Sequence, residues 1–188
     1  MGKSRQKERG FSIIEAIFAS AILIFVLGAF VVLYTNFSKF YNRQQAEINI
    51  GNSARESVKE LQSSILQADQ IAASHTFSGT TYSTDQDTLV LEIPSIDGSG
   101  NIVSGKHDYI AFYLTGNNLY RLIDADAASS RSSGQNKISD AVSALTFTYN
   151  NPNLALASKV DVNLQMQTIS GGQTIFYNLN QEIYLRNL

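Results

Sequence analysis

The sequence predicts an α+β protein in which a long N-terminal α-helix packs on a C-terminal antiparallel β-sheet domain. An almost uncharged apolar run occupies residues 11–34, and apolar residues recur at helical spacing over residues 54–72. From about residue 75, apolar and polar residues alternate with the period of β-strands. No proline precedes Pro94, so the local sequence does not force the helix to stop after the apolar run.

The N-terminal apolar run is long enough to cross a membrane. Residues 11–34 contain one ionisable residue, Glu15, and as a helix they would measure about 36 Å, against roughly 30 Å for the hydrocarbon core of a bilayer. Residues 1–10 form a basic leader that contains Lys3, Arg5, Lys7 and Arg9. Because positive charge is retained in the cytoplasm, we expect a single-pass protein of the cytoplasmic (inner) membrane. Its N-terminus would be inside and its body outside.

Residues 35–72 predict an amphipathic helix that continues from the membrane into the globular domain. Its apolar residues, at steps of four and three, are Ala54, Val58, Leu61, Ile65, Ala68 and Ala72. Charged residues such as Arg55 and Glu56 lie between them, and Gly51 could loosen the helix locally. We expect the apolar stripe to pack on the apolar face of the sheet, since each of these surfaces needs a partner.

Residues 73–188 predict an extracytoplasmic antiparallel β domain. Val160 and Val162 alternate with polar residues, as in a half-buried antiparallel strand. Gly116–Asn118 and Ser170–Gly172 are typical of hairpin turns, and the Ser/Gly-rich stretch Ala127–Asn136 is expected to be a loop. The expected strands are Thr88–Ile93, Tyr109–Thr115, Leu119–Ile123, Ala144–Tyr149, Lys159–Gln167 and Thr174–Leu185.

Composition and charge narrow the functional classes. The chain has no Cys, so it has no disulfide, no zinc–thiolate site and no thiol nucleophile. Six basic and ten acidic residues follow residue 70, without a basic cluster, so nucleic acid is not expected as a partner. His75 and His107 lack a nearby His or Cys at metal-ligand spacing and are expected on the surface or in loops. The sequence therefore predicts no enzyme, no catalytic residue, no metal site and no cofactor.

Two segments resemble ligand-binding loops. Gly100–His107 comes close to a phosphate-binding loop, but it lacks the Ser or Thr that would hold magnesium, and a strand pattern follows it. The segment that begins at Asp97 has the composition of a calcium loop with a single carboxylate. We interpret both segments as turns, with calcium binding as the alternative for the second.

Residues 10–15, Gly-Phe-Ser-Ile-Ile-Glu, form the most specific motif in the chain. Between a basic leader and a long apolar helix, this segment closely resembles the processing site of the type IV prepilin family. The resemblance implies that a prepilin peptidase cleaves between Gly10 and Phe11 and N-methylates Phe11. It also implies that Glu15 acts in assembly, by pairing with the Phe11 amine of a neighbouring subunit. The implied partners are the prepilin peptidase, other pilin or pseudopilin subunits, the inner-membrane assembly platform and, before assembly, membrane lipid.

The carboxylate of Glu15 is also compatible with roles inside its own chain. A charge within an apolar span costs roughly 2.5–3.5 kcal/mol, so it calls for a partner, which cleavage would create as the α-amine of Phe11. Glu15 is four residues from Phe11 on one helical face, so it could pair with its own amine. Ser12 and Glu15 fit a capping box, which would give the carboxylate a local role at the helix start. A last alternative is an ordinary signal peptide cleaved after residues 19–21, Ala-Ser-Ala.

The stretches LVLEIP, VSALTFTY and YLRNL extend the resemblance to large minor pilins and J-type minor pseudopilins. Major pilins often carry a Pro where this chain has Val32, and their C-terminal disulfide loop is impossible without Cys. The expected function is therefore that of a minor pilin or pseudopilin, a structural subunit of a type IV filament. The alternatives are a competence pseudopilin involved in DNA uptake, and a signal-anchored extracytoplasmic binding or sensor domain that never polymerises.

Overall fold

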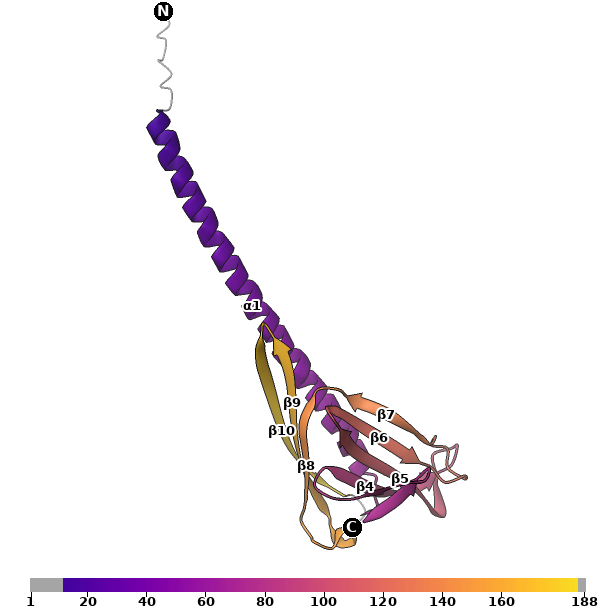
Figure 1. Ribbon diagram of the computed structural model, residues 1–188. Helices are drawn as coiled ribbons and strands as arrows, with labels where there is room; N and C mark the ends of the chain where they lie inside the picture. The colour runs from indigo at the N-terminus through magenta and orange to yellow at the C-terminus, as the bar shows by residue number, and fades with distance from the viewer. Residues whose placement is uncertain (1–11, 186–188) are drawn as a thin grey trace, which may run out of the picture. The chain divides into compact units, whose positions relative to one another are not determined.

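The computed structural model describes residues 12–185 (Figure 1). The chain forms two compact units, residues 1–44 and 45–188. Helix α1 (Ile13–Ile65) contributes its first part to one unit and its last part to the other, and every β-strand belongs to the second unit. A long N-terminal helix followed by antiparallel sheets confirms the predicted α+β class.

Helix α1 passes through both of its glycines, Gly28 and Gly51, without a break. Gly51 is buried, and a Cβ atom built on it would lie 3.1 Å from Cε2 of Tyr177. A glycine at this position therefore lets the aromatic ring approach the helix backbone, which is a packing role rather than the local loosening expected from the sequence.

Helix α1 ends at Ile65, whereas the sequence predicted helix as far as residue 72. The N–H groups of Gln67 and Ala68 donate to carbonyl groups three residues earlier, which tightens the last turn. The N–H of Asp69 then donates to the carbonyl of Glu92, and the chain enters the sheet. Residues 66–72 contain neither Gly nor Pro, so the helix is ended by pairing with a distant strand and not by a local stop signal.

The strands form two antiparallel sheets and a separate hairpin (Figure 1). The five-stranded sheet has the order β1 (Gln70–Ile71), β4 (Thr88–Ile96), β5 (Ile102–Thr115), β6 (Asn118–Asp124) and β7 (Gly134–Ser139). The three-stranded sheet has the order β10 (Gln173–Tyr184), β9 (Lys159–Ser170) and β8 (Val142–Tyr149). The hairpin consists of β2 (Ser74–Phe77) and β3 (Thr80–Ser83), and a short 3₁₀ helix, η1, spans Leu154–Leu156.

All six strands expected from the sequence are present, with small differences at their ends. Both predicted hairpin turns are confirmed, and Gly116, Gly171 and Gly172 adopt the positive φ angles that such turns favour. The sequence missed β1, β2, β3 and β7. The expected loop Ala127–Asn136 was wrong at its end, because β7 begins at Gly134 and pairs with β6 despite its polar, Gly-containing sequence.

The main core lies between the last part of α1 and the two sheets. Ala54, Val58, Leu61 and Ile65 are at most 5% exposed and belong to one buried cluster with residues of β4, β5, β8 and β9. This confirms the predicted stripe up to the end of the helix. Burial of each Leu or Ile side chain contributes about 1.5–3 kcal/mol, so this face anchors α1 in the second unit.

A second, smaller core covers the opposite face of the five-stranded sheet. Phe77 of the β2–β3 hairpin packs there with Val90 and Ala111. Ala72, which the sequence placed on the helical stripe, packs against this second cluster instead. Because β4 is covered on both faces, its central residues are apolar in succession and do not alternate.

Candidate functional site

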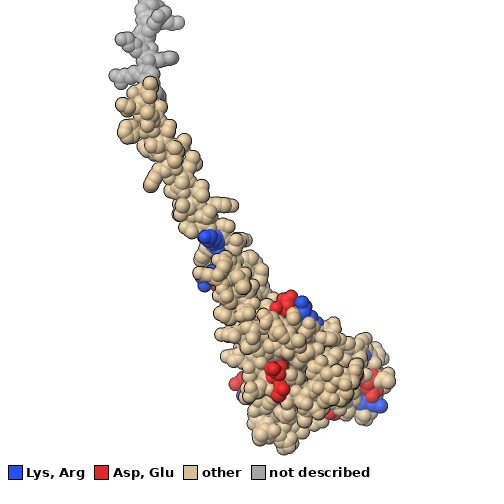
Figure 2. Space-filling view, in the orientation of Figure 1, with Lys and Arg blue, Asp and Glu red and all other residues tan. Residues whose placement is uncertain are grey.

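The first unit presents a continuous apolar surface along α1. This part of the helix is long and apolar enough to cross a membrane, and none of its most apolar stretch is buried within the structure. The large apolar side chains from Ile13 to Leu33 are between 40% and 82% exposed. Figure 2 shows no charged side chain on the visible face of this stretch. The first part of α1 is therefore a candidate membrane span.

The polar side chains of this span make hydrogen bonds within the helix. The hydroxyl of Ser20 donates to the carbonyl of Ala16 at 2.7 Å, and that of Thr35, just beyond the span, donates to the carbonyl of Val32 at 2.9 Å. A hydroxyl bonded to its own helix can enter a hydrocarbon environment without an unsatisfied donor.

Glu15 is the single ionisable residue between Ser12 and Tyr34, and it lies exposed in the first turn of α1. Ser12 immediately precedes the helix, and its carbonyl accepts the N–H of Ala16. These are the positions of a capping box, but within residues 12–185 no hydrogen bond links the two side chains or engages the Glu15 carboxylate. Gly10 and Phe11, the two predicted processing residues, lie outside the described residues.

A buried ion pair, which the sequence analysis missed, fixes the loop between β6 and β7. The carboxylate of Asp108 is fully buried and accepts hydrogen bonds from Ser95 Oγ, Ser129 Oγ, the Asp126 N–H and Arg131 Nη1, all between 2.7 and 2.9 Å. Although burial raises the pKa of Asp108, the bonds from Arg131 and the two serines outweigh it and hold the pKa below its usual value. The available signal was a charged residue at an inward-facing position of an apolar strand, two residues before Ile110.

The two histidines lie in strands and not in loops, which corrects one part of the expectation. His75 of β2 stacks on Tyr109 with ring centroids 3.7 Å apart, and its Nε2 lies 2.8 Å from Asp124 Oδ2. His107 Nδ1 of β5 lies 3.2 Å from Glu92 Oε1. Each histidine is partly exposed and beside a carboxylate. This arrangement fixes the β2–β3 hairpin and the sheet in place, and it contains no nucleophile.

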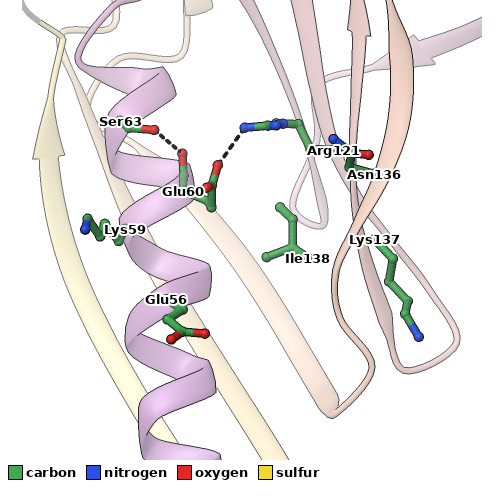
Figure 3. A pocket seen from close by; sticks show the side chains of 8 residues that line it. All are labelled: Glu56, Lys59, Glu60, Ser63, Arg121, Asn136, Lys137 and Ile138. Atoms are coloured by element: carbon green, nitrogen blue, oxygen red, sulfur yellow. Dashed lines mark hydrogen bonds and ion pairs between the residues drawn. The ribbon is translucent and has the colours of Figure 1, made fainter.

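A polar groove of about 690 Å³ lies between α1 and the β6–β7 edge of the second unit (Figure 3). Arg121 of β6 reaches across to Glu60 of α1, with Nη1 2.6 Å from Oε2. Lys137 and Glu56 also line the groove, so its charges largely cancel. It therefore favours neither an anion nor a cation.

The two loop-like segments are turns. Asp97 Oδ1 accepts the backbone N–H groups of Ser99 and Asn101, and the hydrogen bonds of Asn101 contribute most to a lowered pKa of Asp97. The backbone donors already occupy this carboxylate. From residue 102 the chain is strand β5, so no phosphate-binding loop forms. Among residues 12–185 no group of three or more His, Cys, Asp or Glu side chains is placed to hold a metal ion.

No protein-family model matches the chain, and no curated protein matches its sequence. The prepilin-type resemblance therefore depends on the motif at residues 10–15 and its position ahead of the apolar helix.

Proposed function

We propose that the chain is a minor pilin or pseudopilin, a structural subunit of a type IV pilus or secretion pseudopilus. The observation that carries this proposal is the fully exposed apolar start of α1, with one carboxylate, Glu15, in its first turn. This helix follows directly on the Gly10–Phe11 motif. An enzyme or a soluble binding protein has no use for such a surface, whereas a subunit stored in a membrane and then packed against other helices requires it.

In the proposed mechanism the span first holds the subunit in the cytoplasmic membrane. The basic leader keeps the N-terminus inside, and the β domain lies outside. Prepilin peptidase then removes residues 1–10 and methylates the new amine of Phe11. Helix–helix contacts in the filament replace lipid contacts along the span, with the assembly platform driving the transfer.

Glu15 sets the register of this assembly. An unpaired carboxylate in an apolar environment costs roughly 2.5–3.5 kcal/mol, and pairing with the Phe11 amine of a neighbouring subunit removes most of that cost. A subunit shifted by one helical turn would leave both charges unpaired. The pair therefore selects one axial position for each incoming subunit.

Intact-mass measurement after expression with and without a prepilin peptidase tests the proposal. We expect loss of residues 1–10 and gain of one methyl group only when the peptidase is present. A Gly10→Val variant should stay uncleaved, because a branched side chain replaces the small residue at the cleavage point. A wild-type chain that still begins at Met1 or Gly2 with the peptidase present would instead favour a permanently anchored sensor or binding domain.

Glu15→Gln separates assembly from processing. The amide has nearly the size of the carboxylate but no charge, so we expect normal cleavage and methylation with strongly reduced recovery in sheared filaments. Ser12→Ala is the matched control, because it removes the other half of the capping-box pattern and leaves the charge. If Ser12→Ala reduces filament recovery as much as Glu15→Gln does, the carboxylate acts at the helix start and not between subunits.

A further inference from the structure

The outward face of the three-stranded sheet is an array of uncharged amide and hydroxyl groups. The sheet packs Val162 and Leu164 into the main core, so the alternate residues of each strand face away from α1. Thr146, Asn163 and Asn180 lie opposite one another on β8, β9 and β10 and form one row across this face. All three are exposed, and none of their side chains has a hydrogen-bond partner within the described residues.

The next row along the strands contains charged residues and a hollow. Thr148, Asp161 and Glu182 form this row, and together with Asn163 and Asn180 they line a hollow of about 310 Å³. This volume is at the lower end of the range for small-molecule sites.

One oxygen in this hollow lacks a partner. Lys159 Nζ lies 3.1 Å from Asp161 Oδ2 and 3.5 Å from Glu182 Oε1, so one cation balances part of the negative charge. Asp161 Oδ1 is buried and accepts no hydrogen bond from the described residues. A buried carboxylate oxygen without a donor calls for one from outside the chain.

We propose that this hollow binds a neutral sugar unit, a pyranose that carries adjacent hydroxyl groups. A hydroxyl can donate to Asp161 Oδ1, which has no other donor among the residues described. Adjacent hydroxyls can each donate and accept, and the carboxamides of Asn163 and Asn180 offer a donor and an acceptor in one plane. The exposed ring of Tyr184 follows Glu182 on the same face and supplies an apolar surface for the carbon side of the sugar ring.

The charges of the hollow argue against other ligand classes. Asp161 and Glu182 outnumber Lys159, so an anionic ligand such as a phosphate or a uronic acid would be repelled. The polar lining offers little surface to an apolar ligand. The inference does not depend on assembly into a filament, because all of these residues belong to the second unit.

Saturation-transfer NMR on the full chain in zwitterionic detergent micelles tests the proposal. Detergents with sugar headgroups are avoided because they would compete. The probes are the methyl glycosides of glucose, galactose, mannose and N-acetylglucosamine, together with maltotriose, cellotriose and glucuronic acid. We expect transfer to at least one neutral glycoside and weaker transfer to glucuronic acid. A trisaccharide that binds more tightly than its monosaccharide identifies a polysaccharide as the source, and equal binding identifies a free sugar.

Asn163→Ala and Asn180→Ala should each weaken binding about fivefold, as expected for loss of one neutral hydrogen bond. Gln62→Ala, which removes an exposed amide of α1 away from this sheet, should leave binding unchanged. Near-UV circular dichroism of the tyrosines verifies that each variant is folded. The proposal is overturned if no neutral glycoside receives transfer, if glucuronic acid binds as well as glucose, or if the double asparagine variant binds like the wild type.

Discussion

Replacement of Asp108 by asparagine should destabilise the β domain by several kcal/mol. The carboxylate is fully buried and has four donors around it, and the side chain of Arg131 beside it is only 17% exposed. Asparagine keeps the size of the side chain, but its NH₂ group would face a donor, and the guanidinium would remain buried without a counter-charge. Removal of one partner of a buried ion pair costs about 3–5 kcal/mol. Domains of this size have about 5–15 kcal/mol in total, so the loss is a large part of the stability.

Urea unfolding of the full chain in detergent micelles measures this loss. The chain has nine Tyr and no Trp, so near-UV circular dichroism follows the tyrosines, seven of which lie after residue 80. With a slope of about 1–3 kcal/mol per molar urea, the midpoint should fall by at least about 1 M. The double variant Asp108→Asn/Arg131→Met should recover part of the loss, because it leaves no buried charge unpaired at this site.

Lys106→Ala is the matched control for this experiment. Lys106 pairs with Asp126 in the same region, but its side chain is 51% exposed, so its loss should cost less than about 1 kcal/mol. If Asp108→Asn shifts the midpoint no more than Lys106→Ala does, the buried pair does not hold the loop and our reasoning fails.

Three further predictions concern burial and charge in the second unit. Leu61→Ala, at a fully buried position of α1, should cost about 2–5 kcal/mol in urea unfolding, whereas Ile48→Ala, at a position 55% exposed, should cost less than about 1 kcal/mol. The lowered pKa of Asp108 gives stability that is present above the ordinary value of 3.8 and is lost as the pH falls through the lower folded value. Acid titration should therefore destabilise the wild type more than Asp108→Asn over that range, and equal losses would contradict this assignment. Phe77→Ala should speed amide hydrogen exchange in β2 and β3 while the amides of β9 stay protected, and uniform acceleration would show that the two cores open together.

The sequence was sufficient to predict the elements that have a clear hydrophobic period. The stripe from Ala54 to Ile65 and the alternation of β9 each bury one face, and the pattern shows which residues those are. The apolar run of α1 was also evident, since an exposed surface of that length has few alternatives. Glu15 was found by its position in this run and not by any contact.

The features that the sequence did not predict arise from pairing between distant residues. The end of α1 depends on Asp69 meeting Glu92, and strand β7 exists because β6 offers it a free edge. Local propensity carries little information about either. The Asp108–Arg131 pair joins residues 23 positions apart, and nothing near either residue indicates its partner. The unpartnered oxygen of Asp161 likewise became visible only with three strands in register.

The two sheets differ in how much sequence change each can accept. The five-stranded sheet has a core on both faces, so nearly every substitution in the middle of β4 must preserve both shape and polarity. The three-stranded sheet has one face in contact with water, and the outward residues of β8, β9 and β10 can be exchanged without repacking. Variation among descendants of this chain should therefore concentrate on that sheet. A new surface specificity could arise there while the scaffold that carries it stays intact.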